Sequence, residues 1–356
     1  MNYRMSELLA SESANTAATK TIDINLAKPI SRITVQIKGT NNLSVPTAHP
    51  AKMISKIELV DGSMTIFSLS GIQCQALDYY QLGRMPTTVM EFRNDVMAIP
   101  TFELNFGRYL WDEVLAFDPS KFVNPQLKIT HNKALGGSAP DAATLTVNAF
   151  VFDDKEISPT GYLMQKEQFS YTLVASAAQQ IDLAVDYPYR SLMIQSLTGG
   201  KQPWENYNSI KLSEDHDASV LINGQKTSDL LKLFKDQPDI VEYVHALDLN
   251  GGVTCYCTPT YQVGIVGLGI DAFNGSLYSA QSYGGTFSAT GDNNEHAAFM
   301  ISGSNPHGAM QIPFGKPEII EDWYNTSDIG SLILTITAGS GASGTVEIIS
   351  EQIKTY

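Results

Sequence analysis

The sequence contains few of the residues on which disulfide-bonded and metal-binding proteins depend. Its 356 residues include three cysteines, Cys74, Cys255 and Cys257. This number gives no disulfide framework and is typical of a protein that folds in a reducing cytoplasm. Cys255 and Cys257 would point to the same face of a strand, but a metal site of this type needs a second such pair. We therefore expect two small buried side chains at these positions.

Long hydrophobic runs are also missing. The most apolar stretch, residues 263–270, has eight residues and contains glycine, whereas a membrane-spanning helix needs about 20 apolar residues. The N-terminus lacks the apolar segment of a secretion signal. We therefore expect neither a membrane span nor export.

Positive charge is scarce, because 23 lysines and arginines face 37 acids and give a net charge of −14. This balance argues against direct nucleic-acid binding, which needs a concentrated cationic surface. Residues 1–60 are the exception, with seven basic and four acidic side chains. Arg4 and Lys20 in this segment are therefore candidates for contact with anionic lipid headgroups. The alternative is a solvated arm without a partner.

No recognisable catalytic, cofactor or metal motif appears, and we expect no catalytic residue, cofactor or metal ligand. The six histidines are scattered without zinc-binding spacing. Residues 301–305 (Ile-Ser-Gly-Ser-Asn) only resemble a nucleophile elbow and are interpreted as a loop. Acidic clusters at 213–217 and 292–295 lack EF-hand spacing. We interpret them as polar turns in preference to Ca²⁺ sites.

The most informative feature that is present is a repeat with an offset of 153 residues. Residues 57–81 and 210–234 share strand, turn, strand, glycine and helix patterns. Ile57 matches Ile210, Leu59 matches Leu212, Gly71 matches Gly224 and Leu77 matches Leu230. A repeat of this length indicates a duplicated domain. The alternative is a chance agreement between two β-rich halves.

The rest of the chain reads mainly as short strands separated by turns. Alternation from Ile33 to Ile37 and from Leu145 to Val151 predicts strands with one buried face. Asp61-Gly62 predicts a hairpin in which both turn residues have positive φ. Met5 to Leu9 is expected to form one or two helical turns in an otherwise weakly structured arm.

These signals give a domain map for the whole chain. It contains an N-terminal arm (1–24), a first β domain (25–155), a charged linker (156–166), and a second β domain (167–356) with a large insertion within 235–311. The insertion contains six aromatic residues that either form a sugar- or partner-binding surface, or pack the insertion onto its own roll or the neighbouring subunit. They are Tyr256, Tyr261, Phe273, Tyr278, Tyr283 and Phe287.

The segments 54–71, 77–80, 185–194 and 208–212 carry a resemblance to a known family. The chain resembles the double jelly-roll major capsid proteins of tailless icosahedral viruses, and is most similar to those that infect bacteria and contain an internal membrane. The resemblance implies an all-β fold of two tandem eight-stranded jelly-roll β-sandwiches, with short helices in the connections.

The resemblance also implies a homotrimer whose six jelly rolls form a pseudo-hexagonal tile of the virion capsid, assembled in the host cytoplasm. The implied partners are neighbouring capsomers, penton and minor capsid proteins, and the inner viral membrane through the N-terminal arm, near Arg4 and Lys20. The insertion would lie at the opposite, outward end. Two rival interpretations stay open: a carbohydrate-binding β-sandwich module or adhesin, and a β-sandwich hydrolase with unlocated acids.

Overall fold

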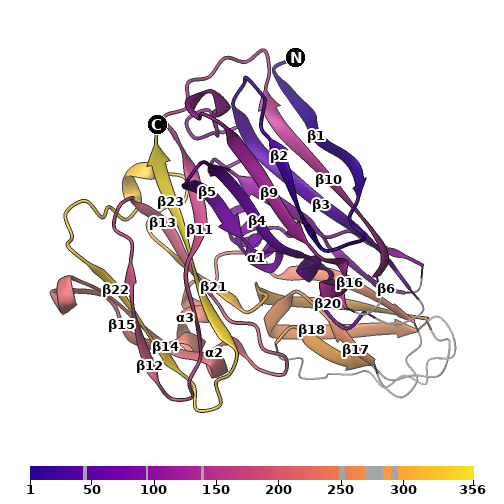
Figure 1. Cartoon of the computed structure of the whole chain (residues 1–356). Helices are drawn as coiled ribbons and strands as arrows, with labels where there is room; N and C mark the ends of the chain where they lie inside the picture. The colour runs from indigo at the N-terminus through magenta and orange to yellow at the C-terminus, as the bar shows by residue number, and fades with distance from the viewer. Residues whose placement is uncertain (43–45, 94, 138–139, 248–252, 270–283, 290–295) are drawn as a thin grey trace.

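Two β-sandwiches and a smaller third sheet make up the molecule (Figure 1). The structure, a computed structural model, describes residues 1–42, 46–93, 95–137, 140–247, 253–269, 284–289 and 296–356. Among these residues, no helix has the length and apolar character needed to cross a membrane.

The first sandwich consists of two four-stranded layers, with the two-residue strand β7 (Met97–Ala98) added beside β3. One layer has the order β1 (Tyr3–Ser13), β10 (Pro140–Phe152), β3 (Ile30–Asn41) and β8 (Thr101–Asn105). The other has the order β2 (Ala18–Asp23), β9 (Pro125–His131), β4 (Ile54–Asp61) and β5 (Met64–Leu69). The expected alternation is confirmed, since Ile33, Val35 and Ile37 are fully buried in the core between the layers.

The second sandwich repeats this arrangement strand by strand. One layer has the order β11 (Gly161–Thr172), β23 (Thr345–Thr355), β13 (Tyr189–Gln195) and β21 (Ala309–Pro313). The other has the order β12 (Ala178–Leu183), β22 (Leu332–Ala338), β14 (Tyr207–Glu214) and β15 (Ser219–Lys226). Each order matches that of the first sandwich, so the expected two eight-stranded jelly rolls are confirmed.

Irregularities in strand pairing repeat as well. Leu8 is the extra residue of a bulge between Glu7 and Leu9 on β1, and Gln168 is extra between Glu167 and Phe169 on β11. Ser31 on β3 and Arg190 on β13 form a second matching pair of bulges. Because a bulge is a specific backbone feature and not a consequence of hydrophobic patterning, these matches are strong support for duplication.

The offset of 153 residues holds for β4 and β14 but not beyond the turn that follows them. The first hairpin turns through Gly62 and Ser63, and only Gly62 has positive φ (59°). The second turns through the four residues Asp215–Ala218. Helix α1 (Gly71–Leu82) therefore corresponds to α3 (Thr227–Leu233) with a larger offset. The expected equivalence of Gly71 and Gly224 is wrong, because Gly224 lies inside β15.

The N-terminal segment is not a weakly structured arm. Residues 3–13 form β1, which pairs with β10, and residues 18–23 form β2, which pairs with β9. The helical turns expected at Met5 to Leu9 are wrong, since β10 and β9 supply partners that local sequence does not reveal. The first roll therefore includes strands from residues 3–23. Similarly, β11 begins at Gly161, within the expected linker.

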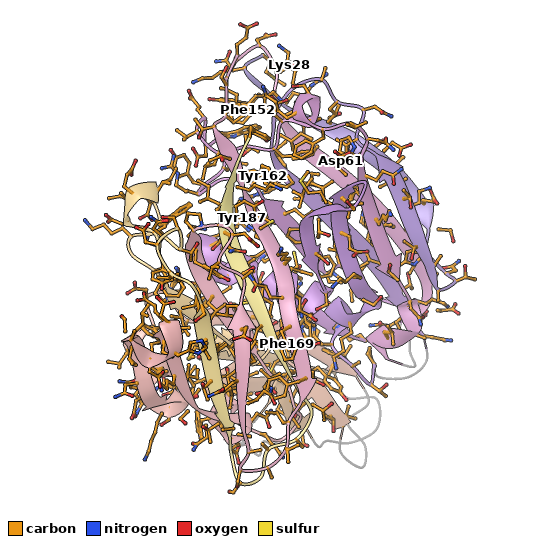
Figure 2. The ribbon with its side chains drawn as sticks, turned by 60° about the vertical axis from the view of Figure 1, so that its left-hand side comes forward. Lys28, Asp61, Phe152, Tyr162, Phe169 and Tyr187 are labelled. Carbon is orange, nitrogen blue, oxygen red and sulfur yellow. The ribbon has the colours of Figure 1, made fainter. Side chains whose placement is uncertain are left out.

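The connections hold the remaining helices, all short. They are α2 (Pro203–Asn206) and the 3₁₀ turns η1 (Pro50–Met53), η2 (Pro119–Lys121), η3 (Lys133–Gly136), η4 (Asp215–Asp217) and η5 (Ile320–Asp322). In Figure 2, Lys28, Phe152 and Asp61 lie toward one end of the molecule and Phe169 lies toward the other.

The insertion folds into β structure together with a segment of the first roll. A four-stranded sheet has the order β18 (Pro259–Gly269), β20 (His296–Pro306), β16 (Ile240–Leu247) and β6 (Val89–Phe92). A separate pair consists of β17 (Val253–Tyr256) and β19 (Thr286–Ala289). Residues 301–305, interpreted above as a loop, lie in β20. Parallel pairing of β6 with β16 thus joins the two halves of the chain.

Candidate functional site at the junction of the two rolls

The two rolls share one continuous sheet. Strand β5 ends the layer of the first roll and pairs in parallel with β11, so Phe67 lies opposite Gln165 and Ser68 lies opposite Lys166. The result is an eight-stranded sheet that runs from β2 through both rolls to β21. Because the rolls share backbone hydrogen bonds as well as side-chain contacts, they are joined as one unit.

Helix α1 fills the angle between the rolls. A capping box fixes its start: the Ser70 hydroxyl accepts from the Gln73 backbone N–H at 3.3 Å, and the Gln73 side chain accepts from the Ser70 N–H at 2.7 Å. Gly83 ends the helix with a left-handed φ of 66°. Most of the helix is buried, including the polar side chains of Gln73, Gln75 and Asp78.

On the first-roll side, these polar groups meet strand β8. The Asp78 carboxyl accepts from the Glu103 backbone N–H at 3.0 Å and from the Asn105 side chain at 3.3 Å. Arg32 and Arg84 lie 3.1 and 3.0 Å from the Glu103 carboxylate. Burial, followed by the nearby Glu103 charge, raises the pKa of Asp78 well above its usual range. The two arginines offset the burial of Glu103.

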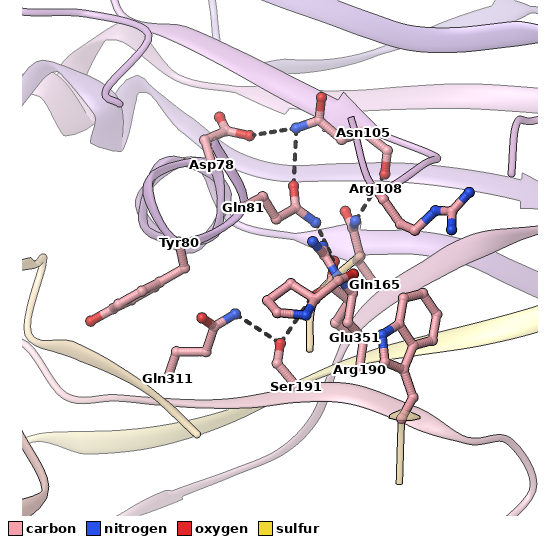
Figure 3. A network of polar contacts seen from close by, with 12 residues as sticks. Asp78, Tyr80, Gln81, Asn105, Arg108, Gln165, Arg190, Ser191, Gln311 and Glu351 are labelled. Carbon is pink, nitrogen blue, oxygen red and sulfur yellow. Dashed lines mark hydrogen bonds and ion pairs between the residues drawn. The ribbon is translucent and has the colours of Figure 1, made fainter. Parts of the chain in front are cut away.

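On the second-roll side, the helix contacts the β11–β23–β13–β21 layer, as Figure 3 shows. Gln81 donates to Glu351, whose carboxylate also lies 2.8 Å from Arg190 and accepts from the Ser191 hydroxyl at 2.9 Å. Gln165 donates to the Asn105 carbonyl at 2.9 Å. Glu351 and Arg190 have side chains only 1% and 5% exposed. The junction therefore contains a buried ion pair of the second roll, and the hydrogen bonds from Gln81 to Glu351 and from Gln165 to Asn105 connect this roll to α1 and to the first roll.

The insertion sheet closes the third side of the junction. His49, which precedes η1, and His307, in the turn between β20 and β21, stack edge to face with ring centroids 4.7 Å apart. His49 is 3.3 Å from the Thr258 hydroxyl, and His307 is 3.1 Å from the Gln75 side-chain oxygen. Both side chains are buried.

Burial changes the protonation of this cluster. It lowers the pKa of His49 to about 3 and that of His307 well below its usual range, so both imidazoles are neutral near pH 7. Burial raises the pKa of Glu242, which accepts from the Thr258 backbone N–H at 2.8 Å, to about 7. Burial thus favours the uncharged forms of His49, His307 and Glu242, which have no ion-pair partner among the described residues of this cluster.

The structure does not bring the two predicted lipid-facing cations together. Arg4 lies on β1 with its side chain 44% exposed, 3.3 Å from Asp153. Lys20 lies on β2, in the opposite layer, 2.6 Å from Glu12. Each cation therefore already has an acidic neighbour, and their contact with a membrane stays a prediction.

The acidic cluster at 213–217 is a turn whose acids have separate partners. Glu214 accepts from the Tyr324 hydroxyl at 2.5 Å, Asp215 accepts from the Gly330 and Ser331 backbone N–H groups, and Asp217 pairs with Lys211 at 2.6 Å. Within the described ranges, no three His, Cys, Asp or Glu side chains are grouped to hold a metal ion. The cluster at 292–295 lies outside the described residues.

The described aromatics of the insertion pack against other parts of the chain as well as within the insertion, since Tyr261 contacts Trp204 and Phe287 contacts Phe299. Tyr261 and Phe287 are 5% and 4% exposed, and Tyr256 stacks on Phe92 of β6. Phe273, Tyr278 and Tyr283 lie outside the described residues. Cys255 and Cys257 are buried in one apolar core with Phe287 and Phe92, in agreement with their interpretation as small hydrophobic residues.

Sequence reasoning missed the junction network. Its residues lie in strands whose alternation is interrupted, as at Arg190-Ser191 in β13 and Glu351-Gln352 in β23. Polar residues at consecutive positions of otherwise apolar strands, one of them charged, are the signal that points to burial against a polar partner. The identity of that partner, α1, depends on tertiary structure alone.

Among known proteins, similarity to this chain is found with solved structures and not with protein families or curated sequences. No protein-family model matches the chain, and no curated protein matches it. The fold is similar to that of the major capsid protein P2 from bacteriophage PM2, with a TM-score of 0.57, 11% identity, and coverage of 99% of this chain and 98% of that one.

Two further structures have the same fold. One is PBCV-1 VP54, fitted into a reconstruction of the virophage Sputnik, with a TM-score of 0.60, 13% identity and coverage of 99% and 94%. The other comes from the atomic structure of Sulfolobus Turreted Icosahedral Virus, with a TM-score of 0.59, 11% identity and coverage of 100% and 91%. These likenesses extend over nearly the whole chain and establish the double jelly-roll fold.

Proposed function

We propose that this chain is the major capsid protein of a tailless icosahedral virus and forms homotrimeric, pseudo-hexameric capsomers. The observation that carries the proposal is the duplicated roll, with the same strand order and matching bulges in both halves. Structures that are similar over nearly the full chain length include the major capsid protein P2 of bacteriophage PM2 and a chain of Sulfolobus Turreted Icosahedral Virus, which supports the same role.

The junction suits a shell component because it makes two equivalent rolls into one rigid tile. Three chains then present six similar rolls around an axis, and a tile of near-sixfold outline packs into flat facets. A shared sheet, a buried helix and buried hydrogen bonds from Gln81 to Glu351 and from Gln165 to Asn105 hold the angle between the rolls. This angle determines whether three copies close into a ring.

The rival functions have less support. A sugar-binding surface would need exposed aromatic side chains, yet Tyr261 and Phe287 of the insertion are buried. A hydrolase would need carboxyl groups that converge on a substrate cleft. The buried acids at the junction, Asp78, Glu103 and Glu351, are instead occupied by neighbouring side chains and backbone groups. We therefore propose a structural role without catalysis.

The finer parts of the proposal concern the virion. The protein would assemble in the cytoplasm of a bacterial host and contact neighbouring capsomers, penton and minor capsid proteins. Since β1 and β2 belong to the first roll, any contact with an inner membrane would come from the roll itself, near Arg4 and Lys20, and not from a free arm. The chain's start and the insertion lie at different ends of the first roll in Figure 1, in keeping with one inward and one outward end.

Electron microscopy of the purified protein at high concentration tests this function. We expect trimeric particles with six-lobed outlines that associate laterally into hexagonal arrays or shells. Isolated single particles with two lobes, at every concentration and salt condition, would overturn the capsid assignment. A glycan array run with the same sample tests the lectin alternative, for which we expect no specific binding.

A further inference from the structure

The contact between the two rolls of one chain is heterologous, because each roll contributes a different strand to it. The edge strand β5 of the first roll is covered by β11 of the second, with Phe67–Ser68 opposite Gln165–Lys166. Such a head-to-tail contact uses two different surfaces, so repetition of the same contact generates either a ring or a filament. The second roll should therefore have an edge strand that is structurally equivalent to β5, and the first roll should have one that is equivalent to β11.

The strand equivalent to β5 is β15, and its outer edge is open. Strand β15 ends its layer in the order β12–β22–β14–β15, and among the described residues no strand pairs with its outer edge. Seven of its eight residues are exposed, including Val220 at 41% and Leu221 at 37%. An open strand edge with apolar side chains is prone to unwanted pairing and is normally covered in a stable assembly.

An apolar hollow lies beside this edge. It has a volume of about 330 Å³ and is lined by Leu221, Ile222, Phe234, Ile312, Phe314 and Tyr324, among others. Leu233, at the end of α3, is 73% exposed nearby in the sequence. In the first roll the corresponding side, after β5, is occupied by α1 and by the second roll. The second roll has α3 in the place of α1, but among the described residues no further roll of the same chain covers β15.

The strand equivalent to β11 is β1, and the bulge that both strands contain fixes which of their residues correspond. Because Glu7-Leu8-Leu9 corresponds to Glu167-Gln168-Phe169, Met5 corresponds to Gln165 and Ser6 corresponds to Lys166. Strand β1 also ends its layer, and Met5 is 63% exposed.

The matching positions on β15 follow from its partner strand. Phe67 pairs with Leu59, and Ile222 pairs with Leu212. Leu59 and Leu212 are equivalent because β4 and β14 differ by the constant offset of 153 residues. Ile222 therefore corresponds to Phe67. A bulge on β15 places two residues, Asn223 and Gly224, where β5 has only Ser68, and Asn223 is the one that directly follows Ile222.

We propose that β15 of one chain pairs in parallel with β1 of a second copy, with Met5 near Ile222 and Ser6 near Asn223. This inference rests on the proposed function and identifies the surface through which the trimer forms. The contact repeats between chains the β5–β11 contact seen within the chain, and it covers the apolar hollow. Backbone pairing supplies the register, and the side chains beside the edge supply the apolar contact.

A disulfide cross-link tests the pairing directly. We expect the double variant Ser6→Cys with Asn223→Cys to form covalent trimers on mild oxidation, as seen on non-reducing gels. Background should be low because Cys74, Cys255 and Cys257 are all buried. The controls are each single variant and the displaced pair Glu12→Cys with Asn223→Cys, which should give several-fold less cross-linked product.

The outcomes separate this inference from the function on which it rests. If light scattering shows a trimer but the double variant cross-links no better than the displaced pair, the β15–β1 pairing is wrong and the capsid function stands. If the protein remains a monomer at high concentration, the trimer itself is absent and both proposals fail.

A charge substitution gives a second test that does not need a disulfide. Leu221→Glu on the open edge should convert the trimer to a folded monomer, and Met5→Glu on the opposite surface should do the same. The matched control is Val123→Glu, since Val123 is 96% exposed on the loop after η2. Circular dichroism establishes that each variant is folded. A trimeric, folded Leu221→Glu variant would contradict the proposal.

Discussion

Replacement of Arg190 by methionine should destabilise the protein more than the loss of any surface ion pair. Its guanidinium lies 2.8 Å from the Glu351 carboxylate, and both side chains are at most 5% exposed. Methionine keeps much of the length and apolar volume but leaves Glu351 as a buried charge with only the hydrogen bonds of Ser191 and Gln81. Breaking a buried pair by removing one partner costs about 3–5 kcal/mol.

The control is Lys211→Met. Lys211 lies 2.6 Å from Asp217, but the two side chains are 31% and 54% exposed. Solvent screening limits an exposed pair of this type to about 1 kcal/mol or less. Both variants replace the cation of a short ion pair by methionine, so the two pairs differ mainly in how deeply they are buried.

Urea unfolding followed by circular dichroism measures both free energies. We also expect the double variant Arg190→Met with Glu351→Met to recover much of the stability, because no unpaired charge then remains in the junction. The reasoning is refuted if Arg190→Met costs no more than Lys211→Met, or if the double variant is less stable than Arg190→Met alone.

Three further predictions follow from the strands and the junction. His49 and His307 have lowered pKa values, so the stability that they contribute is present above pH 6.5 and is lost as the pH falls below it, by about 2 kcal/mol at pH 5 for His49 and in the same direction for His307. Urea midpoints measured against pH should show a smaller acid loss in the double His→Gln variant, and equal losses would contradict the buried neutral pair. Deletion of residues 1–20 removes β1 and half of β2, so circular dichroism and scattering should show a misfolded or aggregated product, whereas a native trimer would show that these strands are dispensable. Replacement of Arg4 and Lys20 by alanine should weaken sedimentation with anionic liposomes in a salt-sensitive way, and unchanged binding would remove the membrane role.

The strand content and the duplication could be predicted from sequence because both depend on local pattern. Ile57, Leu59, Ile210 and Leu212 occupy buried positions of equivalent strands, and their alternation and offset are visible without tertiary information. The offset beyond Gly62 could not be predicted well, because a two-residue difference in turn length moves the downstream strand and helix while apolar residues still match by chance.

Other elements depend on partners that are distant in sequence. Strand β1 is an edge strand with mostly exposed or half-buried side chains, so Tyr3–Ser13 has almost no alternation to recognise. Likewise β6, with four residues, is a strand only because β16 lies beside it. The junction was invisible for the same reason: Asp78 and Glu351 are 273 positions apart, and only the packing of α1 against β23 brings their network together.

Light scattering on the purified protein tests the central claim most directly. Two equivalent rolls with complementary open edges at β1 and β15 predict a stable trimer, with total buried surface well above the ~2,000 Å² at which obligate interfaces begin. We expect a mass close to three times 38.8 kDa at micromolar concentration. A stable monomer of 38.8 kDa under the same conditions would contradict the account.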